Sequence, residues 1–167
     1  MLKKLIVALM LIIPMGLCAQ QKFGHVNSAV IITLMPEYTT AQTELQSLEK
    51  QYTDEIKRME DELNKKGEEF EAQKATLPAN IAERRQNELQ ELYNRMQQYF
   101  QEGQQHMQKA SADKMEAIRA KLTAAIKEVG VAGGYVYIMD VAAGVPYISE
   151  TLSTDVTESV KAKLGIK

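Results

Sequence analysis

Apolar residues recur at steps of three or four between residues 36 and 129, with charged and amide residues between them. This spacing gathers the apolar side chains into a narrow stripe on a helix, which is typical of a coiled-coil seam. The segment Leu-Pro-Ala-Asn at residues 77–80 interrupts the pattern, because a proline disfavours helical geometry at the residue before it. Asn80 is a good N-cap, and Glu83 follows it as in a capping box. The pattern predicts an antiparallel coiled-coil hairpin over residues 37–129, with its tip near residues 77–80.

A single helix kinked at Pro78 is the alternative, because proline is also accepted in the first turn of a helix. Either way, no other proline interrupts the second arm, which begins at Ile81. Gly103 near its middle should cost about 1 kcal/mol relative to alanine. It is therefore a candidate flexible point.

The two ends of the chain have residue types that favour short strands and helices. Asn27 or Ser28 can cap the first short helix and Thr154 or Asp155 the last one, whereas glycines at 130, 133 and 134 should end the second arm. The expected elements are strands at 22–27, 135–140 and 145–149, with helices at 29–35 and 156–164. The predicted fold is mainly α, with the long hairpin projecting from a small β-rich body formed by residues 20–36 and 130–167.

The strand at residues 135–140 is apolar on both faces, with Tyr135, Tyr137 and Met139 on one side and Val136 and Ile138 on the other. Both faces should therefore be covered. Residues 22–36 and 130–167 of the body number about 53, which is marginal for a single hydrophobic core. We therefore expect an obligate oligomer joined through the body. The candidate interface residues are Phe23, Val26, Tyr135, Val136, Tyr137, Ile138 and Met139.

Residues 1–19 have the pattern of a cleavable signal peptide, with two lysines, a short apolar run and small residues before a possible cut after Ala19. The run is too short to span a membrane. The sole cysteine, Cys18, offers an alternative, a lipoprotein acylated at that position, although Leu17 is larger than such cleavage prefers. On the favoured cut, the exported chain has no cysteine and needs no disulfide.

Composition and charge exclude several classes of function. Aromatic residues make up 6% of the chain and tryptophan is absent, which is typical of a coiled coil rather than of an enzyme with a deep pocket. Removal of residues 1–19, which contain Lys3 and Lys4, leaves 18 basic and 22 acidic residues and a formal charge of −4. Without a basic excess, we expect no nucleic-acid binding.

No constellation of residues in the sequence indicates catalysis, a cofactor or a metal. His25 and His106 are far apart in the chain, and neither belongs to a cluster with metal-ligand spacing. The glycines at 130–134 lack the lysine and hydroxyl residue of a phosphate-binding loop. No serine lies in a nucleophile elbow. We therefore expect a protein that is not an enzyme.

The predicted hairpin carries more apolar residues than its seam can bury. Adjacent Tyr99 and Phe100 cannot both face the partner helix, and a two-helix turn cannot bury Leu77, Pro78 and Ile81 together. Methionines are flexible and suit adaptable binding surfaces. These residues are either ordinary coiled-coil core with a few exposed members or a surface that holds a non-native protein. The candidate binding residues are Leu77, Pro78, Ile81, Met96, Tyr99, Phe100 and Met107.

Several short segments near the two ends of the chain are more specific than the hairpin, which is generic coiled coil. In chain order they are Lys-Phe-Gly-His-Val-Asn at 22–27, Met-Pro-Glu-Tyr at 35–38, the strand at 135–140, Pro-Tyr-Ile at 146–148 and the closing segment at 154–164. In this order the segments resemble the Skp/OmpH family of periplasmic chaperones, and the resemblance covers the whole mature chain.

The resemblance implies a homotrimer in the periplasm, in which a small β-rich body joins the subunits and three helical hairpins surround a cavity. Members of this family hold unfolded outer-membrane β-barrel proteins there without ATP. The expected function is therefore that of a holdase, with unfolded outer-membrane proteins and other copies of this chain as partners. The alternative is a structural coiled-coil spacer of the cell envelope, which could be lipid-anchored through Cys18.

The charge of the hairpin departs from that of the best-known family members, whose arms are strongly basic. Residues 37–129 carry 14 basic and 18 acidic side chains. We therefore expect no strong binding to anionic lipids, and weak electrostatic steering of partners at physiological salt.

Overall fold

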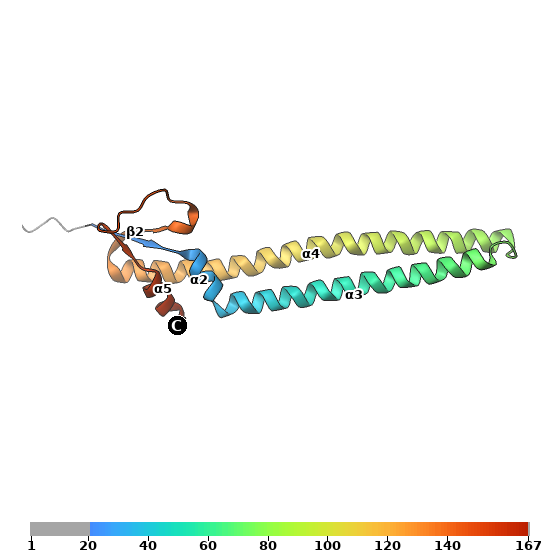
Figure 1. Cartoon of the computed structure of the whole chain (residues 1–167), viewed down its shortest axis with the longest axis horizontal. Helices are drawn as coiled ribbons and strands as arrows, with labels where there is room; N and C mark the ends of the chain where they lie inside the picture. Colours follow the sequence, from blue (N-terminus) through green and yellow to red (C-terminus); the bar gives the residue numbers. More distant parts are fainter. Residues whose placement is uncertain (1–20, 167) are drawn as a thin grey trace, which may run out of the picture. The chain divides into compact units, whose positions relative to one another are not determined.

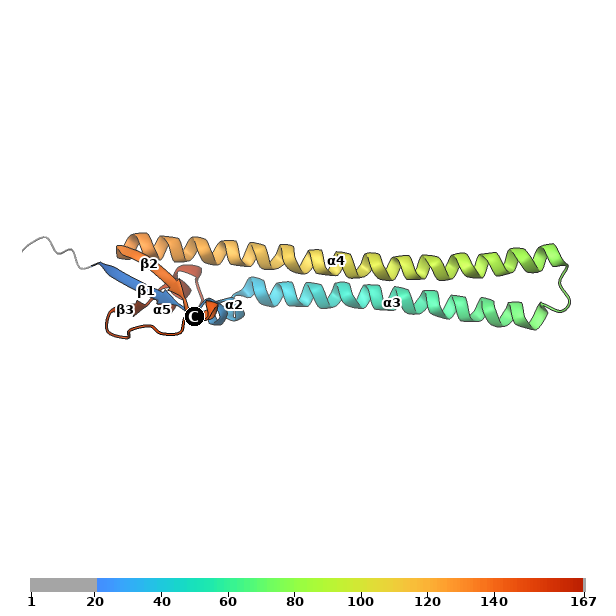
Figure 2. The same ribbon diagram turned by 90° about the horizontal axis from the view of Figure 1, so that it is seen from above.

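The structure is a computed structural model that describes residues 21–166. The predicted signal peptide and Cys18 lie outside the described residues. Long helices and a small three-stranded sheet make up the chain, which confirms the predicted fold class (Figure 1, Figure 2). The described residues form two compact units: a hairpin unit, Thr33–Ala120, and a body unit made of the residues up to Ile32 together with those from Lys121 onwards.

The hairpin unit consists of α3 (Pro36–Gln73) and the greater part of α4 (Ala79–Gly133). Pro36 occupies the first turn of α3, and Glu37 lies near the positive end of the helix dipole. Within this unit the two helices run antiparallel and side by side (Figure 1, Figure 2). The chain is therefore a hairpin and not a single kinked helix.

The reversal between α3 and α4 begins a few residues earlier than predicted. The carbonyl oxygen of Gln73 accepts hydrogen bonds from the N–H groups of Thr76 (2.9 Å) and Leu77 (3.2 Å). The carbonyl oxygen of Pro78 already accepts bonds from residues 81 and 82, so α4 begins at Ala79. Asn80 therefore lies inside the first helical turn, and its predicted role as N-cap of a capping box is wrong.

The seam of the hairpin unit is narrow, as the spacing of apolar residues predicted. Its most buried side chains are no more than 9% exposed. They are Ala41, Phe70, Leu92, Met96 and Ile118. Outside the seam, ion pairs three or four residues apart follow each helix, as between Lys50 and Asp54. Such exposed pairs contribute only a few tenths of a kcal/mol each.

Gly103 has a packing role that its sequence context did not show. It is buried, and a Cβ atom at this position would lie 2.8 Å from Cδ1 of Tyr52 on α3. The Tyr52 hydroxyl lies 2.8 Å from Nδ1 of His106, and its ring packs 5.4 Å from that of Tyr99. The missing side chain at Gly103 thus lets a tyrosine enter the seam.

The body unit contains a parallel sheet of three strands in the order β2-β1-β3. The strands are β1 (Lys22–Val26), β2 (Tyr135–Asp140) and β3 (Ser153–Asp155). The helices that complete this part of the chain are α2 (Ser28–Leu34), the short 3-10 turn η2 (Val141–Ala143) and α5 (Thr157–Leu164). The side chain of Asn27 accepts the N–H of Val30, so Asn27 caps α2 as one of the two predicted residues.

The predicted strand at residues 145–149 is wrong, because these residues form part of a loop. Gly144 has φ +83° and Pro146 has no N–H to offer a neighbouring strand, so the chain leaves the sheet here. The place beside β1 is taken by β3, where His25 pairs with Asp155. Asp155 then accepts the N–H of Thr157 (2.8 Å) at the start of α5.

A β-bulge changes which side chains of β2 share a face. The register between β1 and β2 shifts after Lys22, so that Lys22 pairs with Tyr135 but Phe23 pairs with Tyr137. Tyr135 consequently joins Ile138 near Gly24, instead of lying with Tyr137 and Met139 as strict alternation predicted.

The face with Tyr135 and Ile138 contacts the end of α4. This helix continues through Gly130 and ends at Gly133, four residues later than predicted, and Gly134 follows with φ +66°. The side chain of Ile138 lies against Gly130, and a Cβ at Gly133 would overlap the Tyr135 ring. The two glycines therefore let helix and sheet approach closely.

A carboxylate links β2 to the start of α2. Asp140 accepts hydrogen bonds from the N–H (3.1 Å) and the hydroxyl (2.5 Å) of Ser28, and from the N–H of Ala142 (3.0 Å). Burial alone would raise the pKa of Asp140, but the Ser28 hydroxyl and the two N–H groups outweigh this effect, so its pKa lies below the ordinary 3.8. The folded state thus favours the charged carboxylate.

Replacing Gly103 by alanine should destabilise the hairpin, although alanine favours helix by about 1 kcal/mol. The new Cβ would displace Tyr52, and such repacking typically costs about 1–3 kcal/mol. Gly67 on α3 is the matched control, because no atom lies within 4 Å of its added Cβ. Thermal unfolding at one protein concentration should give a higher Tm for Gly67→Ala and a lower Tm for Gly103→Ala. Equal gains in both variants would contradict the packing role.

Replacing Asp140 by asparagine should lower the free energy of unfolding by about 1–2 kcal/mol at pH 7, because the charged acceptor is lost. The folded-state pKa is depressed, so this stabilisation is complete above the ordinary pKa and disappears as the pH falls below 3.8 through the folded value. Urea unfolding from pH 7 to pH 2.5 should show the two proteins converging. Glu150→Gln, at an exposed position, should remain parallel to the parent over the whole range. A difference between parent and Asp140→Asn that does not depend on pH would contradict this role.

Candidate functional site

The hairpin unit exposes a row of apolar side chains on α4 outside its seam. Tyr93 and Phe100 are both 45% exposed, and Met107 is half-buried. These three residues, the apolar row, are spaced by seven, so they lie on one face of the helix. The row gives α4 a second apolar stripe, which no residue of the seam covers completely.

The residues beside the apolar row belong to the seam. Met96 is only 9% exposed. Tyr99 is half-buried beside Tyr52, and its burial, with a smaller contribution from the Glu55 carboxylate, raises the pKa of its hydroxyl. Of the adjacent pair at 99 and 100, the first residue therefore packs inside the hairpin and only Phe100 is exposed.

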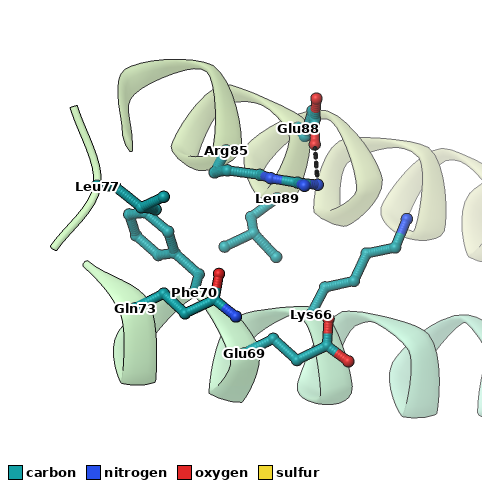
Figure 3. A pocket seen from close by; sticks show the side chains of 8 residues that line it. All are labelled: Lys66, Glu69, Phe70, Gln73, Leu77, Arg85, Glu88 and Leu89. Atoms are coloured by element: carbon teal, nitrogen blue, oxygen red, sulfur yellow. Dashed lines mark hydrogen bonds and ion pairs between the residues drawn. The ribbon is translucent and has the colours of Figure 1, made fainter. Parts of the chain in front are cut away.

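A small pocket lies between the two helices near the tip (Figure 3). It has a volume of about 130 Å³, and its apolar lining comes from Phe70, Leu77 and Leu89. Its complete lining is Lys66, Glu69, Phe70, Gln73, Leu77, Arg85, Glu88 and Leu89. Of the three predicted tip residues, only Leu77 lines this pocket. Pro78 is exposed and Ile81 is half-buried elsewhere on the tip.

The charges at the tip are largely paired. Arg85 and Arg84 both approach Glu88, at 3.1 Å and 3.6 Å. Lys66 lies 2.7 Å from Glu62, and its ammonium group lowers the pKa of that carboxyl. Lys66, Arg84 and Arg85 therefore do not form a free cationic patch.

The body unit presents a second apolar surface, on the face of the sheet opposite Ile138. Phe23 on β1 packs against Tyr137 on β2, with ring centroids 4.9 Å apart. These residues and the loop after η2 line a groove of about 250 Å³. The side chains of Tyr147 and Leu152 on this loop are 79% and 76% exposed. This surface is open to solvent in a single chain.

The predicted interface residues of the body fall into three groups. Tyr137 and Met139 line the groove with Phe23, and Val136 is 59% exposed. Tyr135 and Ile138 lie on the other face of the sheet, against the end of α4. Val26 is 1% exposed and belongs to the core of the body unit.

A serine and a histidine meet on the sheet without forming a catalytic arrangement. Nδ1 of His25 lies 2.8 Å from the Ser153 hydroxyl. Activation of such a pair usually needs a third group that orients the histidine, but Asp155 accepts its hydrogen bonds from Thr157. The His25–Ser153 contact therefore joins β1 to β3. Among the described residues, no group of three histidine, cysteine or acidic side chains could hold a metal ion.

A comparison with models of protein families shows the family of this chain. The family described as "Outer membrane protein (OmpH-like)" matches residues 22–164, nearly the whole of the described chain. The chain belongs to the OmpH-like family. This membership confirms the resemblance found in the segments at the two ends of the sequence. A search of curated proteins found no match.

A solved structure has the same fold as this OmpH-like chain. It is the crystal structure of a proposed OmpH-like outer membrane chaperone from Caulobacter crescentus CB15. The two share 19% sequence identity with a TM-score of 0.75, over 87% of this chain and 85% of the other. At this level of identity the match establishes the fold. No helix among the described residues of the OmpH-like chain is long and apolar enough to cross a membrane.

Sequence analysis missed three exposed residues of these surfaces. Tyr93 could have been found, since it precedes Phe100 by one heptad. Tyr147 lies in a loop where the sequence predicts a strand, and no pattern in the sequence singles out Leu152. The last two are exposed because the loop after η2 leaves the sheet, which no short-range pattern indicated.

Proposed function

We propose that this OmpH-like protein is an ATP-independent holdase of the periplasm, which binds unfolded outer-membrane proteins and prevents their aggregation. The observation that carries this proposal is the apolar row on α4, which remains exposed after the seam is filled. The name of the Caulobacter structure, an OmpH-like outer membrane chaperone, supports the same function. The proposal assigns no catalytic step and no cofactor to the chain.

The apolar row suits a client that is apolar and without fixed structure. A β-barrel membrane strand alternates apolar and polar residues, so its unfolded form exposes apolar side chains that aggregate in water. Tyrosine, phenylalanine and methionine offer large or adaptable apolar contacts that do not require one client sequence. Binding should therefore be broad, with many weak contacts along the helix.

We further propose that the open face of the sheet joins three subunits, as the family resemblance implies. The contact residues are those around the groove: Phe23, Tyr137, Met139, Tyr147 and Leu152. Apolar residues exposed to this degree on so small a unit favour association. Val26, Tyr135 and Ile138 are left out of this interface because they pack within the chain. Three hairpins held in this way would surround a cavity for the client.

The alternative function, a structural envelope spacer, fits the apolar row less well. A spacer needs a filled seam and has no use for exposed tyrosine and phenylalanine at heptad spacing. A signal peptide at residues 1–19, cleaved after Ala19, would place the chain in the periplasm. The paired charges of the hairpin are consistent with weak binding to anionic lipids.

The holdase function can be tested by diluting a urea-unfolded outer-membrane β-barrel into buffer with the mature protein. Light scattering should show that the barrel stays soluble. The triple variant Tyr93→Ser, Phe100→Ser and Met107→Ser should weaken binding by roughly tenfold or more, because each apolar side chain loses burial worth about 1 kcal/mol or more.

The matched control changes Asn87, Gln98 and Gln105 to serine, which are exposed polar residues on a face of α4 away from the apolar row. It should suppress aggregation as the parent does, with the oligomer intact in both variants. Precipitation of the barrel with the parent protein would instead support the spacer. Equal binding by both variants would show that the apolar row is not the contact surface.

Assembly through the open face of the sheet predicts a trimer that Leu152→Glu dissociates. A carboxylate buried in an apolar interface costs several kcal/mol. Sedimentation should give three subunit masses for the parent and one for the variant. Thr151→Glu adds the same charge one residue away, at an exposed position that does not line the groove, and should remain trimeric. A monomeric parent, or an unchanged Leu152→Glu trimer, would contradict this interface.

A further inference from the structure

Residues 97–108 of α4 differ in composition from the rest of the hairpin. They contain six glutamines and only one charged side chain, Glu102. In a chain that is 25% charged, about three would be expected over this length. The segment surrounds Phe100 and Met107 of the apolar row, so the proposed binding surface is neutral but rich in hydrogen-bonding groups.

Four of these glutamines form a second row beside the apolar row. Gln97, Gln101, Gln104 and Gln108, the amide row, follow one another at steps of four, three and four, so they share one face of the helix. Gln97 and Gln104 lie three residues before and four residues after Phe100, which makes them its neighbours on the helix surface. The two rows run in parallel along α4.

The amide row has unused hydrogen-bonding capacity. All four side chains are exposed, and none makes a side-chain hydrogen bond within residues 21–166. Gln98, on another face, does have a partner, because its Nε2 donates to Glu102 (2.7 Å). Gln90 likewise donates to Asn94 (3.0 Å). The four side chains of the amide row are thus available to a bound molecule, whereas Gln90, three residues before Tyr93, is already paired.

The chemistry of a carboxamide matches that of a peptide group. Each glutamine side chain offers two N–H donors and one carbonyl acceptor without net charge. An unfolded chain exposes neutral N–H and C=O groups at every residue except proline. Phosphate groups of lipids or nucleic acids would instead require lysine or arginine, which are absent from residues 97–108.

We propose that the amide row hydrogen-bonds to the main chain of an unfolded polypeptide, while the apolar row contacts its side chains. This inference rests on the proposed holdase function and names the part of the client that is recognised. Because every polypeptide has the same main chain, recognition by the amide row does not depend on the client's sequence. Because neither partner is charged, it also depends little on salt.

A second copy of α4 is the competing occupant of this face. The peptide groups of a helix are already bonded to one another. A helix would therefore leave the main-chain chemistry of the amide row unused. An unfolded client offers main-chain donors and acceptors together with apolar side chains, which both rows can use.

The first test compares two double variants of the full mature protein. The first carries Gln97→Met and Gln104→Met, and the second carries Gln98→Met and Gln105→Met. Methionine has the length and helix propensity of glutamine but only a weak acceptor. Binding of a urea-diluted outer-membrane β-barrel should weaken roughly five- to 25-fold in the first double variant, since each neutral hydrogen bond that is lost corresponds to about fivefold. The second double variant, shifted by one residue to another face, should bind within about twofold of the parent.

The second test uses an unstructured peptide with the sequence of one barrel strand and its analogue N-methylated at alternate peptide groups, at 50 mM and 500 mM salt. The parent protein should bind the unmodified peptide about equally at both salt concentrations and the methylated one several-fold more weakly. The first double variant should discriminate less between the two peptides.

The outcomes separate this inference from the holdase function. If the parent binds neither barrel nor peptide, the proposed function itself is wrong. If it binds both but the two double variants bind equally well, or methylation has no effect, the amide row is not the contact and the holdase function stands. If the oligomer mass changes only in the first double variant, the amide row contacts a second copy of the chain, and this result would overturn the inference.

Discussion

Two helices alone can bury only one narrow stripe each, and this constraint governs the hairpin unit. The seam takes up residues such as Leu92, Met96 and Ile118. A further apolar residue on α4 has no third helix to cover it, so it stays exposed unless another molecule binds. The exposure of Phe100 therefore follows from the architecture, and the function proposed here uses it. The polar neighbours of this residue keep the exposed surface soluble.

The body unit shows the same constraint in a sheet. A three-stranded sheet has two faces, and only one of them packs against the end of α4 within the chain. The bulge before Phe23 moves Tyr135 to the covered face and leaves Tyr137 on the open one. The open face then carries apolar side chains that a small unit cannot bury by itself. Association between subunits is the simplest way to remove them from water.

Both units use close packing at a glycine. Gly103 admits Tyr52 into the seam, and Gly133 admits Tyr135 at the end of α4. In both places a tyrosine fills the space that a side chain would occupy. Tyr52 also ties the two helices together through His106, while Tyr99 beside it leaves Phe100 to face outwards. Packing inside the hairpin thus determines which aromatic residue is available outside it.

The sequence by itself determined the hairpin, the outer strand at 135–140 and the family, because helical periodicity, the proline at 78 and β-forming residues are local signals. It also indicated that the hairpin has surplus apolar residues. The tertiary structure decided which of Tyr99 and Phe100 is exposed, since that depends on Tyr52 in the other helix. It also decided that β3 lies at 153–155 and that Val26 is core, because strand pairing and burial depend on residues more than 100 positions away. Periodicity records the face of an element, but only contacts between distant segments fix what covers that face.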